Sequence, residues 1–472
     1  MSRMFPSSSR DGANAPAGRP AAAGQTPALS QQLAEVAQCL QAILAGQSGT
    51  QALAAVPQRL RPGVQALLFQ VLRQLGRAQA LRAELAPRTP PPRVNALLCT
   101  ALALAWDEAQ APYPPFTLVN QAVEAAKRGP AQRQAAFINA CLRRFLRERD
   151  ALVQKTDAQP PALWNHPQWW IDRVQQDHPA HWQQILQANN AHAPMTLRVN
   201  RLQTSVAQYQ QALAAQQMAA TPVGESGLEL TQPQPVQALP GFAQGQVSVQ
   251  DAAAQMAAPL LLQGLDLSQP LRVLDACAAP GGKTAHLLEY AGSGSGTGVD
   301  APLQVTALEI DAERSQRIHE TLARVGVKAQ VLVADASRPD QWWQQASGGA
   351  LFDAILLDAP CTASGIVRRH PDVRWLRRAS DVGQLAAIQS RLLDTLWPLL
   401  RAGGRMLYCT CSVFKAEGDL QVQAFLARNT QARLLVSPGH LIPGNAAQTA
   451  TVPDNHPGDH DGFFYALLEK KP

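Results

Sequence analysis

Two cysteine-containing segments have the residue types of a covalent catalyst. Cys361 follows Asp358-Ala359-Pro360 after an apolar run, and a second apolar run ends in YCTCS, which contains Cys409 and Cys411. A cysteine at the end of a strand, beside a basic and partly exposed crevice, can be held as the thiolate that attacks carbon. Because residues two apart on a strand face the same way, the pattern alone does not choose between Cys409 and Cys411.

Two other interpretations give these cysteines no catalytic role. A buried cysteine usually behaves as a small apolar residue, which is the better interpretation for Cys39, Cys99 and Cys141. Cys409 and Cys411 could supply two zinc ligands, but no second Cys/His pair at metal-ligand spacing accompanies them, so no metal site is expected. The seven cysteines are odd in number and scattered along the chain. That distribution is unlike a disulfide framework and favours a reducing compartment.

A glycine-containing turn is the next candidate site. The sequence DACAAPGGKT at 275–284 directly follows a predicted strand. Its glycines allow a ligand to approach the backbone closely, and its N–H groups precede a predicted helix. Only Gly281 and Gly282 precede Lys283, so the spacing differs from that of a P-loop and a phosphate cradle is not expected. A tight turn without a ligand would explain the segment about equally well.

Carboxylates at neighbouring strand ends favour a ligand site. Glu309, Asp335 and Asp358 each stand at the end of a predicted strand. The carboxyl ends of parallel strands meet at one edge of a sheet, where acids can accept hydrogen bonds from ribose hydroxyls, an exocyclic amine or an ammonium group. One such acid is routine helix capping, whereas three in register favour a nucleotide-like ligand.

A parallel α/β sheet would position these residues. From about residue 246 onward, short apolar runs alternate with helical patterns, which is typical of that fold class. Helices are expected near 312–325 and 381–400. The predicted strands are Arg272–Asp275, Val305–Leu308, Gln330–Val333, Ala354–Leu357, Arg405–Cys409 and Phe463–Leu468.

The chain divides into four segments by composition and periodicity. Residues 1–28 are rich in Ala, Pro, Gly and Ser and are expected to form a disordered tail. Residues 29–155 contain five amphipathic runs and predict a helical bundle. Residues 156–245 predict a small α+β domain, and residues 246–472 the α/β domain.

Length and charge limit the class of protein. The 472 residues suffice for about three compact domains, and no apolar run approaches the roughly 18 residues of a membrane span. Residues 1–155 carry 18 Lys and Arg against 8 Asp and Glu, and residues 156–472 carry 23 against 27. A basic first part joined to a nearly neutral remainder favours a polyanion-binding domain beside a catalytic one, although a solvated helical surface explains the charge equally well. A cytoplasmic protein is expected.

Taken together, the motifs resemble those of RNA cytosine-5 methyltransferases that use S-adenosylmethionine. Within that family the domain order is similar to the ribosomal small-subunit methyltransferase B group, whose N-terminal domain resembles the antitermination factor NusB. The resemblance implies a multidomain fold: an all-α NusB-like RNA-binding bundle, a small α+β linker domain and a C-terminal Rossmann-like α/β methyltransferase domain. It runs from about residue 30 to 472, apart from a Gly/Ser insertion near 292–299. The matching strings are DACAAPGGKT (275–284), LLDAPCTASG (356–365), RRHPDVRW (368–375), YCTCS (408–412) and DGFFYA (461–466).

The resemblance also implies roles for matching residues. In this family the Thr-Cys cysteine is the nucleophile and the Pro-Cys cysteine assists release, which implies Cys411 and Cys361 respectively. Asp358 is implied to face both the cofactor and the target base. The family more often has Asp where Glu309 stands, which keeps the carboxylate and lengthens its reach. The implied S-adenosylmethionine-binding residues are Cys277, Ala278, Ala279, Pro280, Gly281, Gly282 and Lys283, with Glu309 on the ribose, Asp335 by the adenine, and Asp358.

Basic residues supply candidate RNA contacts. In the bundle these are Arg143 and Arg144, with Arg147 and Arg149 nearby, although a solvated helix face would look the same. Directly after the Pro-Cys loop, the candidates near the reacting base are Arg368, Arg369 and His370, of which His370 could instead be a turn residue before Pro371.

The sequence thus predicts a monomeric enzyme that forms 5-methylcytosine in 16S ribosomal RNA, with no membrane or metal partner. One alternative is the same reaction on transfer RNA. Another is a non-catalytic NusB-like RNA-binding assembly factor, against which the joint presence of Lys283, Asp358, Cys361 and Cys411 argues.

Overall fold

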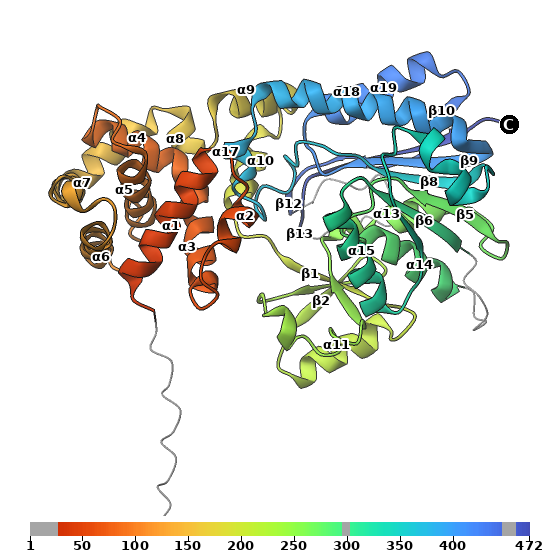
Figure 1. Ribbon diagram of the computed structural model, residues 1–472, viewed down its shortest axis with the longest axis horizontal. Coiled ribbons are helices and arrows are strands. Elements are labelled where there is room, and N and C mark those ends of the chain that lie inside the picture. The colour runs from red at the N-terminus through yellow and green to blue at the C-terminus, as the bar shows by residue number, and fades with distance from the viewer. Residues whose placement is uncertain (1–26, 295–302, 446–458) are drawn as a thin grey trace, which may run out of the picture.

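The computed structural model describes residues 27–294, 303–445 and 459–472. Residues 1–26 of the tail expected at 1–28, and much of the Gly/Ser insertion, therefore lie outside the described residues. In Figure 1 a helical bundle stands at one end of the molecule and a helix-covered sheet at the other, with a small sheet beside the latter. Within the described part of the chain, each helix is too short or too polar to cross a bilayer.

The N-terminal bundle is built around one helix that is apolar on all sides. Every residue of this helix from Ala96 to Ala105 is buried, which places it in the middle of a core rather than at a surface. The other helices pack around it with one apolar face each. The bundle helices are α1 (Leu29–Leu44), α2 (Gly49–Ala54), α3 (Arg61–Arg73), α4 (Leu75–Leu85), the central α5 (Pro92–Ala105), α6 (Pro115–Arg128) and α7 (Ala135–Asp157).

Helix α4 was not among the five helices expected from the sequence. Gly76, which was expected to end the preceding helix, lies inside α4, where an added Cβ would stand 2.1 Å from the Pro161 carbonyl oxygen. Arg77 is also on the buried face, where it donates to Thr156 Oγ1 at 2.6 Å and forms an ion pair with Asp157. A glycine and an arginine on the inner face hide the apolar periodicity on which the prediction relied.

A small antiparallel sheet follows three connecting helices. The connecting helices are α8 (Pro160–Trp164), α9 (Gln168–Asp177) and α10 (Trp182–Asn190). The sheet has strand order β2-β3-β1-β4 and carries α11 (Val206–Ala215) on one face, in agreement with the expected α+β character. Its strands are β1 (Met195–Val199), β2 (Ala220–Val223), β3 (Gly227–Leu230) and β4 (Val247–Val249).

The C-terminal sheet contains all six strands expected from the sequence. Its order is β10-β14-β9-β8-β5-β6-β7, in which β9, β8, β5, β6 and β7 run parallel. β14 is antiparallel to β9, and β10 is antiparallel to β14. The strands are β5 (Leu271–Asp275), β6 (Leu303–Glu309), β7 (Gln330–Val333), β8 (Phe352–Asp358), β9 (Leu400–Thr410), β10 (Ala432–Leu434) and β14 (Phe463–Lys470). A short β11 (Gly439–Leu441) also pairs with β14, and β12 (Gly444–Asn445) pairs with β13 (Asp459–His460).

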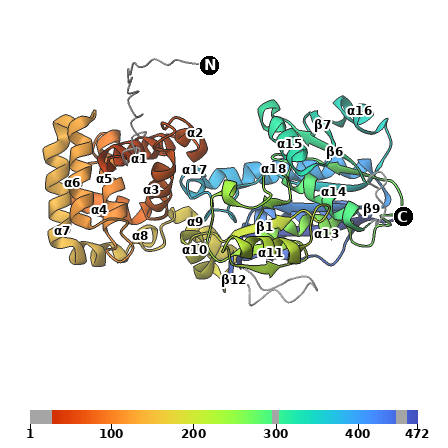
Figure 2. The same ribbon diagram turned by 90° about the horizontal axis from the view of Figure 1, so that it is seen from below.

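Helices cover both faces of this sheet, as Figures 1 and 2 show. One face packs against α13 (Ala257–Leu262), α14 (Gly282–Gly294) and α15 (Ala312–Val325), and α12 (Ala252–Gln255) precedes them. The other face packs against α18 (Ala379–Leu396) and α19 (Asp419–Arg428), with α16 (Trp343–Ser347) beside them. Because both faces of the central strands are buried, a strand such as β8 is largely a continuous apolar run, which is why the sequence revealed it.

One loop segment holds the bundle against the C-terminal sheet domain. We call residues 368–377 the strap; it includes the short helix α17 (Val373–Leu376), which lies between the two bodies in Figure 2. The Asp372 carboxylate accepts a hydrogen bond from the Gly49 amide at 2.8 Å, and the Trp375 indole donates to the Leu72 carbonyl at 2.9 Å. These bonds join positions about 300 residues apart in the chain.

Arg374 ties the strap to the connecting helices as well. Its guanidinium is fully buried and donates to the carbonyl oxygens of Asn165 at 3.0 Å and Asn189 at 2.6 Å. Burial, with the nearby Arg73, lowers the pKa of Arg374 to about 9. Arg368 in turn donates to Asp461, just before β14. The strap therefore contacts the bundle, the connecting helices and the C-terminal domain at once.

Candidate active site

Two cysteines meet at the carboxyl edge of the parallel sheet. Cys361 lies in the loop after β8 and Cys411 directly follows β9, its parallel neighbour. The two Sγ atoms are 3.4 Å apart, and both side chains are partly exposed. A shared strand edge thus brings together two sulfur atoms that are separated by 50 residues in the sequence.

The structure separates Cys409 from Cys411, which the strand pattern could not do. Cys409 is fully buried, and its Sγ lies 3.5 Å from Asp358 Oδ1. Cys411, two residues further along, is the one that contacts Cys361. The hydrogen bond with Cys411, burial and the negative charge of Glu417 raise the pKa of the Cys361 thiol well above its ordinary value, so Cys361 is held in the protonated form.

A lysine and an aspartate form an ion pair beside the cysteines. Lys283, in the first turn of α14, places Nζ 2.7 Å from Asp358 Oδ2 and 5.0 Å from the centre of the Phe463 ring. Burial alone would lower the pKa of Lys283, but the adjacent Asp358 carboxylate and the neighbouring cysteines raise it above its ordinary value. The site therefore contains a fixed positive charge next to a carboxylate.

A cavity of about 460 Å³ opens over the glycine-containing turn. The turn contributes Cys277 through Pro280, Gly282 and Lys283 to its wall, and Asp275 and Asp358 line it as well. Gly281 has φ +94°, a conformation that favours glycine, and an added Cβ there would lie 3.0 Å from Ile318 Cα. The turn can therefore pack tightly against α15 while its backbone faces the cavity.

The small antiparallel domain closes the other side of this cavity, which the sequence did not predict. Phe242, Val249 and Gln250 line the cavity opposite the turn. Arg198 in β1 fixes this arrangement, because it forms a fully buried ion pair with Glu289 of α14 at 2.8 Å and donates to the Gly282 carbonyl at 2.8 Å. No sequence motif marked these residues, since their roles depend on how two domains pack.

The residues present fit a nucleoside with a positively charged group. Asp275 Oδ1 is buried and has no hydrogen-bond partner among the described residues, and it belongs to a side chain that lines the cavity. Glu309 is the last residue of β6 and Asp335 follows β7 on the same edge, but neither lines this cavity in the structure. Glu309 is buried and accepts from the Asp311 amide at 3.1 Å and from Arg314 at 3.2 Å.

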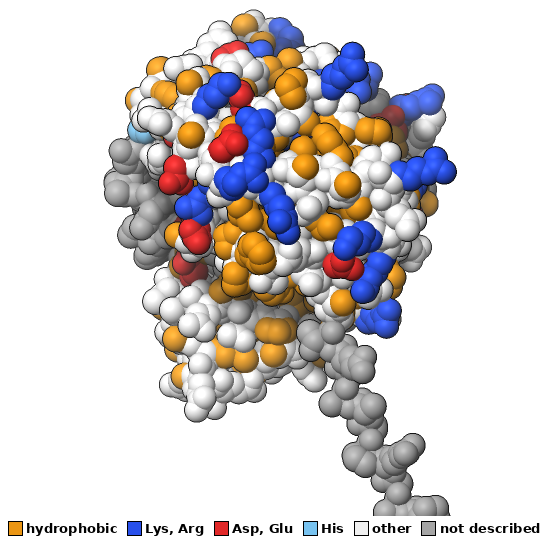
Figure 3. Space-filling model, turned by 90° about the vertical axis from the view of Figure 1, so that its left-hand side faces the viewer, with side chains coloured by type: hydrophobic (Ala, Val, Ile, Leu, Met, Phe, Trp, Pro, Cys, Tyr) orange, Lys and Arg blue, Asp and Glu red, His pale blue; other side chains and the backbone are white. Residues whose placement is uncertain are grey.

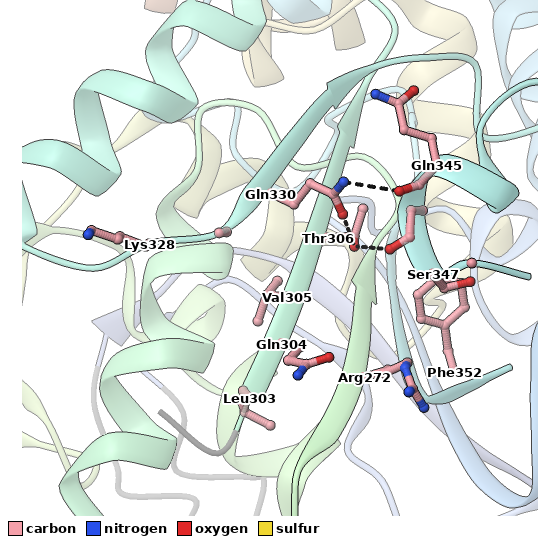
Figure 4. A pocket seen from close by; sticks show the side chains of 13 residues that line it. Arg272, Leu303, Gln304, Val305, Thr306, Lys328, Gln330, Gln345, Ser347 and Phe352 are labelled. Carbon is pink, nitrogen blue, oxygen red and sulfur yellow. Dashed lines mark hydrogen bonds between the residues drawn. The ribbon is translucent and has the colours of Figure 1, made fainter. Parts of the chain in front are cut away.

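A second cavity lies at the opposite edge of the sheet, where the strands begin. Figure 4 shows Arg272, Thr306 and Gln330 around it, and its volume is about 580 Å³. None of the site residues expected from the sequence lines this cavity. The described residues also include no group of three or more His, Cys, Asp or Glu side chains able to hold a metal ion.

The expected RNA contact at Arg368 needs correction. Its side chain is 1 % exposed and donates to Asp461 and Asp459, each at 2.6 Å, so the guanidinium cannot reach a phosphate from this position. Arg369 is partly exposed but pairs with Asp461 and with Asp251 at 2.7 Å. These arginines anchor the loop that follows Cys361, and their charges are already neutralised by carboxylates.

The other candidate RNA contacts lie on the surface. His370 and Arg143 are exposed, and Arg144 forms an ion pair with Glu148 at 2.9 Å. Arg149 pairs with Glu108 at 2.6 Å. Figure 3 looks onto the bundle end of the molecule, where Lys and Arg side chains are spread over the surface among apolar ones.

Asp275 gives the site a measurable pH dependence. Burial raises its pKa to about 7, although the Thr284 hydroxyl, 2.6 Å away, opposes the shift. Because the folded pKa is raised, the favourable contribution to stability is present below about pH 4 and is lost as the pH rises through 7. We therefore expect the stability of the wild type, relative to Asp275→Asn, to fall by up to about 4 kcal/mol over this range. Denaturant unfolding of both proteins at pH 4 to 8 measures this; parallel pH profiles would contradict it.

Comparison with known proteins shows which family has this arrangement. A NusB family model matches residues 28–147, a model for the ferredoxin-like domain of RsmF/B-like methyltransferases matches 166–237, and the 16S rRNA methyltransferase RsmB/F model matches 262–469. Ribosomal RNA small subunit methyltransferase B of Vibrio cholerae is 40 % identical over 438 residues, covering 90 % of this chain and 94 % of the relative. This chain belongs to that methyltransferase family. The expected fold class, with a NusB-like bundle, a small linker domain and an α/β methyltransferase domain, is confirmed.

Further members and solved structures agree with this assignment. The family member of Pasteurella multocida is 38 % identical, with 87 % of this chain and 88 % of the relative covered. The crystal structure of PH0851 superposes with a TM-score of 0.70 at 24 % identity and covers 93 % of this chain and 99 % of that one. The structure of NSun6 from Pyrococcus horikoshii with SFG gives a TM-score of 0.52 at 18 % identity, covering 65 % of this chain and 98 % of that one. At these identities the two structures support the fold.

Proposed function

We propose that the protein transfers a methyl group from S-adenosylmethionine to C5 of a cytidine in 16S ribosomal RNA, through a transient bond between Cys411 and C6 of the base. The observation that carries this proposal is the contact between Cys411 and Cys361 at 3.4 Å, beside the Lys283–Asp358 pair. Two sulfur atoms next to a cavity for a nucleoside are what a two-cysteine methyl transfer requires. The names of the bacterial relatives support ribosomal RNA of the small subunit as the substrate.

The chemistry explains why two cysteines are useful. C5 of cytosine is a poor nucleophile, so the Cys411 thiolate adds to C6, and the displaced electron pair makes C5 nucleophilic. S-adenosylmethionine supplies an electrophilic methyl group. After transfer, a base removes the C5 proton, and the electron pair of that C–H bond re-forms the double bond while the C6–S bond breaks. Cys361, kept as a thiol 3.4 Å from Cys411, is placed to protonate the departing sulfur and so assist release.

The cavity residues support a binding mode for S-adenosylmethionine. Under this proposal Cys277–Lys283 surround its methionine and sugar parts. Glu309 binds the ribose hydroxyls and Asp335 lies by the adenine, both from the same sheet edge outside the cavity. Asp358 accepts hydrogen bonds at the junction of cofactor and base. SFG, which accompanies the related NSun6 structure, is an S-adenosylmethionine analogue, in keeping with this cofactor.

The RNA must present an unstacked base to this site. Enzymes that act on a base take it out of the stack, which favours a single-stranded or loop region. The surface residues Arg143, Arg144 and His370 are the proposed RNA contacts, whereas Arg368 is structural. We further propose that the protein acts as a monomer in the cytoplasm, where bacterial ribosomes assemble. The transfer RNA and non-catalytic alternatives are not favoured by the family assignment.

A labelling experiment tests the proposal. Purified protein is incubated with methyl-labelled S-adenosylmethionine and either small-subunit ribosomal RNA or transfer RNA, and the product is mapped for 5-methylcytosine. We expect label in ribosomal RNA alone. Preferred methylation of transfer RNA would replace the substrate assignment, and RNA binding without methyl transfer would favour an assembly factor.

A further inference from the structure

A buried glutamate lies behind both cysteine loops. Glu417 ends the short 3-10 helix Lys415–Glu417, just before α19, and its side chain is fully buried. It is six residues beyond Cys411, and neither the cofactor cavity nor any family motif quoted above includes it. A carboxylate is rarely buried in this way unless its oxygens are hydrogen-bonded.

The Glu417 carboxylate accepts hydrogen bonds from both cysteine loops. Thr362, the residue after Cys361, donates its amide to Oε1 at 2.9 Å and its hydroxyl to Oε2 at 2.5 Å. Ser412, the residue after Cys411, donates its hydroxyl to Oε2 at 2.6 Å. One rigid group therefore holds the neighbours of both sulfur atoms.

A second set of bonds fixes the glutamate itself. Gln389 in α18 donates to Glu417 Oε1 at 3.2 Å and to the Pro360 carbonyl at 2.9 Å. The Tyr408 hydroxyl donates to the Glu417 carbonyl at 2.7 Å. Because every member of the network is buried and bonded to more than one partner, movement of either cysteine loop would break several hydrogen bonds.

The contacts favour a role at the sulfur atoms over general packing. The side-chain donors to Glu417 include the residues that directly follow Cys361 and Cys411, and the cysteine loops are also bonded to each other, from the Gly365 amide to the Cys411 carbonyl at 2.9 Å. The negative charge of Glu417 is also one cause of the raised pKa of Cys361. Removal of this residue should therefore alter both the distance between the sulfurs and the protonation of one of them.

We propose that Glu417 is a positioning residue that sets the separation of the Cys361 and Cys411 sulfur atoms by holding both loops through one carboxylate. This inference deepens the proposed function and rests on it for its catalytic consequence. Its geometric part does not depend on RNA or on S-adenosylmethionine, so the two can be tested separately.

The geometric part is tested by disulfide formation without RNA or cofactor. Diamide, an azo oxidant, takes two electrons and two protons from the two thiols, giving a hydrazine and a Cys361–Cys411 disulfide, which peptide mass spectrometry quantifies. Sulfur atoms 3.4 Å apart need little movement to reach the bonded distance of about 2.05 Å. We expect Glu417→Ala to slow this step at least about tenfold, and Glu417→Gln, which keeps the shape and can bond the same partners, to restore most of the rate.

The catalytic part is tested by methyl-transfer kinetics on the same proteins. A displacement of about 1 Å between reacting groups can cost on the order of 100-fold in rate, so we expect Glu417→Ala to lower kcat by that order. KM for S-adenosylmethionine should stay unchanged, because Glu417 does not line the cofactor cavity. In Glu417→Gln the pH profile of Cys361 alkylation should move to lower pH, because the negative charge is gone.

Val422→Ala is a control for a purely structural effect. Val422 is buried in α19 and packs in the core on the same side of the sheet. Its apolar side chain cannot hydrogen-bond either cysteine loop. We expect it to lower stability through a cavity while leaving disulfide formation and kcat unchanged. Wild-type rates in Glu417→Ala, or an equal loss in Val422→Ala, would overturn the proposal. If the wild type failed to methylate RNA, the proposed function would fail, whereas the disulfide rates would still decide the role of Glu417.

Discussion

Replacement of Cys411 by alanine should abolish both methyl transfer and any covalent bond between protein and RNA. Without the sulfur atom no nucleophile adds to C6, so C5 is never activated. Loss of a covalent nucleophile costs on the order of 10⁶ in kcat in a well-studied protease, and a loss of this order would reduce turnover to background. Methyl incorporation and denaturing gels of protein incubated with 5-fluorocytidine-containing RNA measure the two effects.

The cysteines of the bundle provide a matched control. Cys141→Ala removes a buried thiol in α7, far from the sheet edge in sequence and in the fold, and should leave turnover unchanged. Normal activity in Cys411→Ala would show that another residue is the nucleophile. Activity lost instead in Cys409→Ala, with Cys411→Ala unaffected, would exchange the roles of the two strand-end cysteines.

Replacement of Cys361 by alanine should have a different result: accumulation of an RNA–protein adduct. Cys411 can still add to the base and methyl transfer can still occur, but the thiol 3.4 Å away that assists release is missing. Loss of general acid–base assistance lowers rates by about 10² to 10⁴, so release becomes the slow step. A labelled methyl group that migrates with the protein on a denaturing gel would report the trapped species.

A double variant separates this adduct from nonspecific crosslinking. Cys361→Ala combined with Cys411→Ala should form no adduct, because the trapped bond requires the second sulfur. If Cys361→Ala turned over at the wild-type rate and trapped nothing, another group would have to assist release, and the contact between the two sulfurs would need a different explanation.

Local patterns were sufficient to predict the catalytic sheet. The central strand β8 is buried on both faces, so its apolar run Ala354–Leu357 marks its centre without tertiary information. The same apolar runs predicted where β8 and β9 end. Because the two strands are parallel neighbours, this also predicted that Cys361 and Cys411 lie at one edge of the sheet. The sequence could not distinguish Cys409 from Cys411, because that depends on which neighbouring loop each side chain meets.

The missed features all depend on contacts between segments distant in the chain. Arg368 looked like an RNA contact because basic residues are usually exposed, but Asp459 and Asp461, about 90 residues away, neutralise it in the interior. No sequence pattern pointed to Glu417, because the hydrogen-bond partners of its carboxylate come from the two cysteine loops and α18. The role of Arg198 in the cofactor cavity likewise requires two domains to be in place.

Because of the strap, the methyltransferase domain is not expected to be stable without the bundle. Trp375 and Leu376 pack against the apolar core of the bundle, and Asp372 takes the Gly49 amide as a partner. A truncated catalytic fragment would expose two large apolar side chains to water and leave Asp372 and the Trp375 indole without their bundle partners, in the strap that follows the Cys361 loop. It should therefore aggregate and lose order in the strap. Exchanging the bundle of this chain for an unrelated RNA-binding module would meet the same obstacle.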